Sequence, residues 1–256
     1  MFANATSDRF VEDGFLVLRS AVPANVVTEC QNEIAETLLN EGVDVDEPTS
    51  WKPVVRVDCP RTPAFETAGG QQALTDAYDL LLRAGMWSKP RGVGGTIPVR
   101  FPSRLDPGDA GWHVDGSYDG DGGYWLNVVS KARALLCLFL FSDVGLRDAP
   151  TELKVGSHLD IPAILEPFGA SGMNSTSLSL SLPPSTLERP SAFATGRAGD
   201  VFICHPFLVH RATWPHRGTR ARMVAQPGIM HDEPFVLDGA DPSPVEQAIL
   251  RGLGRF

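Results

Sequence analysis

The sequence is short of cysteine, of basic residues and of long apolar runs, and each shortage argues against a class of protein. The four cysteines, Cys30, Cys59, Cys137 and Cys204, are far apart and form no C-x-x-C pair, so a structural zinc site is not expected. Lysine and arginine number 22 against 31 aspartates and glutamates. The resulting net charge of −9 disfavours a nucleic-acid partner and docking on anionic lipid.

Apolar runs are too short for a membrane protein. The longest, 134–141, is far below the roughly 18 residues that a membrane span needs. Charged residues at positions 8, 9, 12 and 13 leave no apolar segment typical of a signal peptide. Because two of the cysteines also lie in apolar runs, where buried thiols are usual, we expect a reduced, cytoplasmic protein without a membrane partner.

Several motifs of nucleotide-binding proteins and hydrolases are also absent. The chain contains no G-x-G-x-x-G, no P-loop, no G-x-S-x-G and no H-E-x-x-H. Dinucleotide-binding, serine-hydrolase and zincin functions therefore lack their usual sequence support.

Helical periodicity is found near the N-terminus and at the C-terminus. Apolar residues recur every four positions in Pro23–Asn40, which predicts an amphipathic helix. A second helix is expected over Gln71–Ala84, with Gly85 in the left-handed position that ends it. A capping box at Ser243-Pro-Val-Glu predicts a closing helix over about 243–252. The segment Phe10–Arg19 is interpreted as a turn at glycine followed by a strand.

Between about 90 and 230, short runs of Val, Leu, Ile and Phe alternate with glycine and proline. This pattern is typical of an all-β sandwich or barrel. The expected strands are 97–101, 111–115, 133–141, 152–155, 200–204, 207–210 and 221–226. Segments 116–123, rich in Gly and Asp, and 171–191, rich in Ser and Pro, are expected to be loops that cover a site.

A metal site is predicted from Trp112-His113-Val114-Asp115. Residues two apart on a strand point to the same side, so His113 and Asp115 are presented together. They supply two of the three ligands of the 2-His-1-carboxylate triad, which suits Fe(II) and leaves coordination positions open. A second H-x-D, His158-Leu-Asp160, lies at a strand end and is interpreted as a turn.

The third ligand must come from a distant strand, and 199–210 offers His205 and His210. We favour His210, because it closes an apolar run and precedes polar, cationic sequence. Beyond it, Arg220 and Arg222 share strand parity, and an arginine fork suits the distal carboxylate of a dicarboxylic cosubstrate. The alternative interpretation is that both arginines are surface cations beside an acidic patch and bind no cosubstrate.

Taken together, these residues resemble the phytanoyl-CoA dioxygenase family of Fe(II)/2-oxoglutarate oxygenases over most of the chain. The matching segments are 10–18, 112–115, the stretch 138–158 that ends in Gly-Ser-His, and Ala-Gly-Asp at 198–200 leading to His210. The resemblance places His158 outside the ligand set and implies a mainly β fold with flanking helices, the double-stranded β-helix of jelly-roll and cupin-like barrels. One domain would then span residues 1–256, with N-terminal helices about 23–85, a β core about 90–230 and the closing helix.

The resemblance also implies the chemistry. Iron is held by His113, Asp115 and His210, and 2-oxoglutarate and O2 are the cosubstrates. Arg222 is the expected carboxylate anchor with Arg220 second. Where the family often has serine the chain has Ala212, for which Thr213 or Thr219 is the candidate substitute, and Arg100 is a further candidate contact with the cosubstrate.

The implied reaction is hydroxylation, or a related oxidation, of a C–H bond in a free small molecule, because the carboxylate ligand that halogenases lack is present. A carrier-protein partner is not expected. Candidate substrate contacts are the aromatic residues near these motifs: Trp112, Tyr118, Trp125, Phe207 and Trp214. The alternatives are a non-catalytic jelly-roll binding module and a cupin-like metal hydrolase or isomerase, which would need more histidine ligands.

Overall fold

The largest sheet is built around β6 (Arg133–Leu140), whose residues after the first are all buried. In the computed structural model, which describes residues 2–256, this antiparallel sheet has the order β1 (Phe15–Leu18), β10 (Val201–Cys204), β6 and β12 (Val224–Ala225), and β13 (Gly228–Met230) also pairs with β6. A separate ladder of β2 (Val54–Asp58) and β3 (Thr96–Arg100) lies beside it. A single backbone bridge between Arg100 and Arg222 joins the ladder to the sheet.

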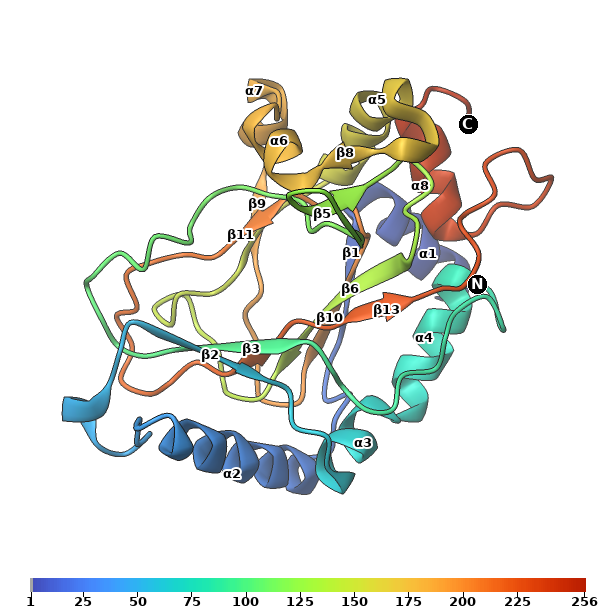
Figure 1. Cartoon of the computed structure of the whole chain (residues 1–256). Helices are drawn as coiled ribbons and strands as arrows, with labels where there is room; N and C mark the ends of the chain where they lie inside the picture. Colours follow the sequence, from blue (N-terminus) through green and yellow to red (C-terminus); the bar gives the residue numbers. More distant parts are fainter. Residues whose placement is uncertain (1) are drawn as a thin grey trace.

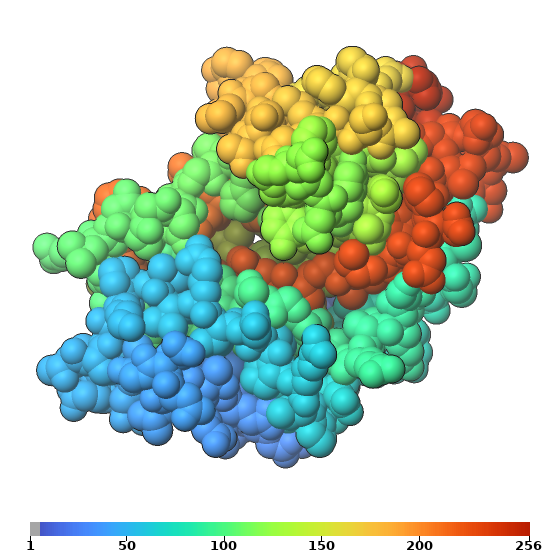
Figure 2. Space-filling model, viewed as in Figure 1, coloured from blue at the N-terminus to red at the C-terminus, as the bar shows by residue number. Residues whose placement is uncertain are grey.

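Two smaller antiparallel sheets lie across from the large one (Figure 1). One contains β11 (His210–Arg211), β7 (Glu152–Lys154) and β9 (Ser191–Phe193). The other contains β4 (Tyr118–Gly120), β5 (Gly123–Leu126) and β8 (Met173–Asn174). Figure 2 shows that the molecular surface is hollowed between the β4–β5 region and the segment around β13.

Helices flank the sheets. The longest, α2 (Ala24–Asn40), runs beneath the large sheet, and α3 (Pro63–Gly69) packs against it (Figure 1). At one side, α1 (Phe2–Asp13), α4 (Gln72–Leu82) and α8 (Pro244–Gly252) pack together. Short helices α5 (Ile161–Leu165), α6 (Ser175–Leu180) and α7 (Pro184–Glu188) lie on the side of the small sheets, with 3₁₀ turns at 48–50, 157–159 and 166–171. Within residues 2–256, no helix combines the length and the apolar character that crossing a bilayer requires.

The expected helices are present: α2 begins at Ala24, and α8 has the capping box between Ser243 and Glu246. The expected end of α4 was wrong, because the helix stops at Leu82 and Arg83, with a φ of +72°, takes the positive-φ position that was predicted for Gly85. The strand pattern was less accurate. Segment 111–115 is not a strand and pairs only through a bridge at His113, and the last predicted strands are reduced to residues 210–211 and 224–225.

Three segments expected to be turns or loops are ordered. Helix α1 replaces the turn expected after Phe10, because Phe10 and Val11 are buried where α1 packs against α8. Most of 116–123 belongs to the β4–β5 hairpin. The 171–191 segment contains α6 and α7, and Asn174 begins α6 by accepting backbone N–H bonds from Thr176 and Ser177.

Gly14 forms a tight junction between α1 and β1. Its φ is +84°, and a Cβ at this position would lie 2.4 Å from Nδ1 of His158 and 2.9 Å from Cδ1 of Leu208. The Gly14 carbonyl accepts the backbone N–H of His205 at 2.8 Å, and Nε2 of His158 donates to the Val11 carbonyl at 3.1 Å. The second H-x-D histidine is therefore part of this junction.

Replacing Gly14 with alanine should lower the free energy of unfolding by about 2 kcal/mol or more, because it adds a clash to the strain of a left-handed residue. Gly85→Ala is the matched control: its φ is +78° and nothing lies within 4 Å of an added Cβ, so strain alone should cost about 1 kcal/mol. Urea denaturation measures both. Equal losses would show that contact with His158 is unimportant.

Acidification should destabilise the fold through buried histidines. Burial lowers the pKa of His158 from 6.5 to about 4 and holds the pKa of the adjacent His205 well below its ordinary value. The unfolded chain therefore binds protons that the folded chain rejects, so stability is full above pH about 6.5 and falls as the pH drops toward 4. Urea denaturation at pH 7.5, 6.0 and 5.0 measures this slope. The dependence of stability on pH should be weaker in His158→Gln. An unchanged dependence would show that protonation of His158 is not its cause.

Candidate metal centre

His113 and His210 face each other across a single antiparallel bridge between the two segments that carry them. Each backbone N–H donates to the carbonyl of the other residue, at 3.0 Å in both directions. The imidazole centroids are 4.3 Å apart as a result. The bridge thus brings together two residues that are far apart in the sequence, although 111–115 does not form the expected strand.

Asp115 completes the group. Its Oδ1 lies 3.7 Å from Nε2 of His113 and 3.8 Å from Nε2 of His210, and the candidate ligand atoms of all three residues lie within 4.8 Å of one another. The His113 and Asp115 side chains are 38% and 30% exposed, whereas His210 is 5% exposed. One face of this group, hereafter the metal trio, is therefore open to solvent and the other is packed against protein.

Hydrogen bonds orient both imidazoles for metal binding. Nδ1 of His113 lies 2.8 Å from the Gly111 carbonyl, and Nδ1 of His210 lies 2.9 Å from the Leu208 carbonyl. A carbonyl only accepts, so each Nδ1 carries a proton, which leaves Nε2 as the metal-binding nitrogen of the neutral ring. This is the tautomer that a metal ligand requires.

Arg133, at the start of β6, holds the other oxygen of Asp115. Its Nη1 donates to Oδ2 at 2.7 Å and leaves Oδ1 for the metal trio. Gly228 on β13 leaves room for the arginine, since a Cβ there would meet its Nε at 3.2 Å. The sequence pattern missed Arg133, which is separated from the H-x-D by the whole β4–β5 hairpin.

The protonation states also suit a metal. Burial, with the neighbouring His113, lowers the pKa of His210 to about 4. Burial by itself would raise the pKa of Asp115, but His210 and Arg133 lower it below its ordinary value. A neutral His210 and an ionised Asp115 at neutral pH match the donor set of the facial triad.

Arg222 is a buried cation without an acidic partner among the described residues. It is 2% exposed, and its Nη2 donates to the hydroxyl of Thr151 at 2.9 Å. Its Nε and Nη1 are buried and make no hydrogen bond. Burial and the nearby Arg100 lower its pKa to about 9. An anion that accepts from these two nitrogens would satisfy the site.

His216 adds a further buried donor near Arg222. The backbone N–H of Gly218 donates to its Nδ1 at 3.1 Å, so the ring proton lies on Nε2, which has no hydrogen-bond partner. Burial, Arg222 and Arg100 lower the pKa of His216, although Asp148 opposes them. Neither His216 nor Thr151 was found from the sequence.

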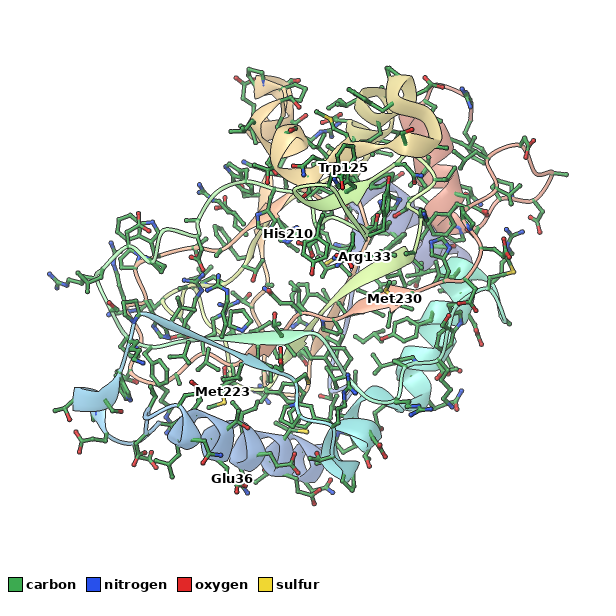
Figure 3. The ribbon with its side chains drawn as sticks, in the orientation of Figure 1. Glu36, Trp125, Arg133, His210, Met223 and Met230 are labelled. Atoms are coloured by element: carbon green, nitrogen blue, oxygen red, sulfur yellow. The ribbon has the colours of Figure 1, made fainter. Side chains whose placement is uncertain are left out.

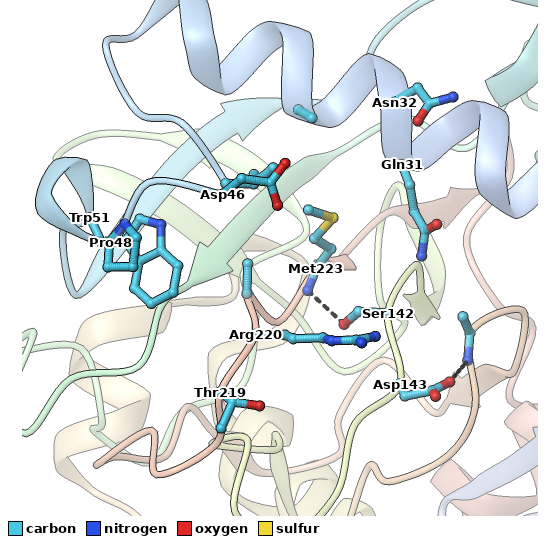
Figure 4. A pocket seen from close by; sticks show the side chains of 14 residues that line it. Gln31, Asn32, Asp46, Pro48, Trp51, Ser142, Asp143, Thr219, Arg220 and Met223 are labelled. Carbon is cyan, nitrogen blue, oxygen red and sulfur yellow. Dashed lines mark hydrogen bonds between the residues drawn. The ribbon is translucent and has the colours of Figure 1, made fainter.

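The other predicted cosubstrate residues are engaged elsewhere. Arg220 is exposed and lies in a cavity of about 760 Å³ beneath α2, with Thr219 and Asp143 (Figure 4). The hydroxyl of Thr213 donates to the Pro150 carbonyl at 2.6 Å. Arg100 is 3% exposed and pairs with Asp109 at 2.6 Å, although its Nε has no partner.

The predicted aromatic contacts separate into two groups. Tyr118 and Trp125 are register partners in the hairpin that follows Asp115. In the view of Figure 3, Trp125 lies above His210. The others lie elsewhere. The ring of Trp112 lies between Arg211 and Lys154, at 4.3 and 4.8 Å, Phe207 is buried against His205, and Trp214 is 45% exposed on an outer surface.

Solved structures share this fold. The epimerase SnoN, in complex with Fe3+, alpha ketoglutarate and nogalamycin RO, has 15% identity and a TM-score of 0.61 over 94% of this chain and 93% of its own. The non-heme alpha ketoglutarate dependent carbocyclase SnoK from nogalamycin biosynthesis has 18% identity and a TM-score of 0.58 over 93% and 87%. HygX from Streptomyces hygroscopicus, with nickel, 2-oxoglutarate and hygromycin B bound, has 16% identity and a TM-score of 0.55 over 89% of this chain and 87% of its own. No family model and no curated protein matches the chain.

Asp115→Asn should weaken Co(II) binding by about 100-fold or more, because it removes an anionic ligand from the metal trio. Asp160→Asn in the second H-x-D is the matched control and should leave Co(II) affinity unchanged, although it breaks the ion pair with Arg189. Titration followed by the visible Co(II) absorption measures both. Equal affinities of the two variants would exclude the metal trio as the binding site.

Proposed function

We propose that this protein is an Fe(II)- and 2-oxoglutarate-dependent oxygenase that acts on a small molecule. The observation that carries the proposal is the metal trio, in which Nε2 of His113 and Nε2 of His210 lie 3.7 and 3.8 Å from Oδ1 of Asp115. The buried, anion-seeking Arg222 supports it. The fold shared with SnoN, SnoK and HygX agrees with this chemistry.

His113, Asp115 and His210 would hold the iron. Bound iron with 2-oxoglutarate and O2 would supply an oxidant for a substrate C–H bond, with release of succinate and CO2. Arg133 keeps Asp115 ionised and holds Oδ2 away from the two imidazoles, so the carboxylate presents one oxygen. Because three protein ligands leave positions open in an octahedral site, both cosubstrates have room.

Arg222 would bind the distal carboxylate of 2-oxoglutarate. Its Nε and Nη1 supply two donors, and Thr151 fixes the guanidinium from the other side. His216 and the Nε of Arg100 add buried donors nearby. The proposal thus keeps Arg222 and Arg100 from the set expected from the sequence. It adds Thr151 and His216 in place of Arg220 and Thr213.

Asp115 favours hydroxylation or a related oxidation over halogenation. We infer that the facing sheets form the double-stranded β-helix of one domain, as in the phytanoyl-CoA dioxygenase family that the motifs resemble. The substrate would enter at the hollow beside the β4–β5 hairpin, where Tyr118 and Trp125 are the aromatic residues nearest in sequence to the metal trio. The neighbours were solved with nogalamycin RO and hygromycin B, which agrees with a free small-molecule substrate.

Anaerobic addition of Fe(II) and 2-oxoglutarate should produce a visible metal-to-ligand charge-transfer band. Arg222→Gln should raise the 2-oxoglutarate concentration needed for half of the band by about tenfold or more, since charged hydrogen bonds are lost. Arg220→Gln, two residues away and exposed, should leave it unchanged. The reverse pattern would identify Arg220 as the anchor. No band from folded, Fe(II)-loaded wild type would favour a non-catalytic binding module.

A further inference from the structure

Three arginines from distant parts of the sequence converge on one cavity of about 750 Å³: Arg104, Arg147 and Arg217. Backbone hydrogen bonds hold their loops together. The N–H of Arg217 donates to the Arg147 carbonyl at 2.7 Å, and the N–H of Ser103 donates to the His216 carbonyl at 3.0 Å. The three loops lie beside one another at the left of Figure 1.

None of these guanidinium groups has a carboxylate partner among residues 2–256. All three residues are exposed, and no ion pair of the described residues includes them. Asp148 accepts from the backbone N–H of Gly145 at 2.7 Å and lines the adjoining cavity together with Arg147 and Arg217. Three unpaired positive charges in a chain of net charge −9 repel one another unless an anion joins them.

His216, a proposed donor to the cosubstrate, also lines this cavity but is only 5% exposed, so the exposed charge of the cavity comes from the three arginines. Nη2 of Arg147 donates to the Arg217 carbonyl at 3.2 Å, which holds two of the three loops together. Arginine forks match the oxygens of phosphate in geometry and charge.

A second cavity, of about 570 Å³, adjoins the arginines and shares Arg147 and Arg217 with them; apolar side chains line much of it, and the ion pair of Glu152 and Arg211 lines the rest. Leu146, Phe193 and Trp214 line it and are 73%, 38% and 45% exposed. Large apolar side chains gathered at one exposed site indicate a binding surface. Neither cavity is lined by the metal trio, by Arg222 or by Thr151.

We propose that this surface binds a phosphate ester, with the phosphate on Arg104, Arg147 and Arg217 and the organic part against Leu146 and Trp214. The ligand is recognised by charge at one end and by apolar contact at the other. None of the three phosphate-binding arginines belongs to the proposed cosubstrate site, so this proposal does not depend on the oxygenase proposal.

Isothermal titration of the full chain with phenyl phosphate, at about 0.15 M ionic strength, tests the proposal. Saturable 1:1 binding is expected, tighter than that of inorganic phosphate. The triple variant Arg104→Gln, Arg147→Gln, Arg217→Gln should weaken phenyl phosphate binding by about tenfold or more. Trp214→Ala should remove the preference for phenyl phosphate over inorganic phosphate.

The matched control is Arg61→Gln, Arg91→Gln, Arg251→Gln, which changes the net charge equally at exposed arginines elsewhere and should bind like wild type. Arg222→Gln should also bind phenyl phosphate normally, which separates this site from the oxygenase proposal. Absence of saturable binding, or equal weakening in the two triple variants, would overturn the proposal. Circular dichroism checks that each variant is folded.

Discussion

The backbone pair between His113 and His210 is the constraint on which the proposed site depends. It joins an otherwise irregular segment to the short strand β11, and two hydrogen bonds set the separation of the imidazoles. Each ring is then oriented by a carbonyl two residues earlier in the chain, so little rotational freedom is left. A second isolated bridge, between Arg100 and Arg222, fixes the backbone from which the buried Arg222 side chain extends. Side chains of the candidate site are thus positioned by single backbone pairs rather than by long strands.

Charge is distributed unevenly across the interior. Asp115 has Arg133 beside it, and Arg100 has Asp109, but Arg222 has only the hydroxyl of Thr151. Burying an unpaired guanidinium is costly, and the lowered pKa of Arg222 expresses that cost. Natural proteins accept such a cost where a ligand removes it, so an anionic cosubstrate would stabilise the fold as well as take part in chemistry.

Local sequence patterns predicted what depends on local spacing. His113 and Asp115 share an H-x-D, the stripe of α2 follows helical periodicity, and the capping box of α8 is readable from Ser243 to Glu246. Arg133, Thr151 and His216 were missed because each reaches the site through tertiary packing, which no spacing within the chain encodes. Helix α1 was missed because its polar first half hides the burial that Phe10 gains against α8. Trp214 and Phe207 show the reverse error, since an aromatic residue near a motif in sequence can lie on an outer surface or in the core.

The hairpin after Asp115 links the cover of the hollow to the candidate metal site. Gly116 has no side chain, and a Cβ there would meet Tyr124 at 2.4 Å, while the N–H of Ser117 donates to the Trp125 carbonyl at 2.7 Å. The first strand of the hairpin begins at Tyr118, and Ser117 fastens the hairpin two residues after Asp115. A change in the hairpin is therefore expected to shift the Asp115 carboxylate as well, so the shape of the hollow and the geometry of the metal trio should vary together.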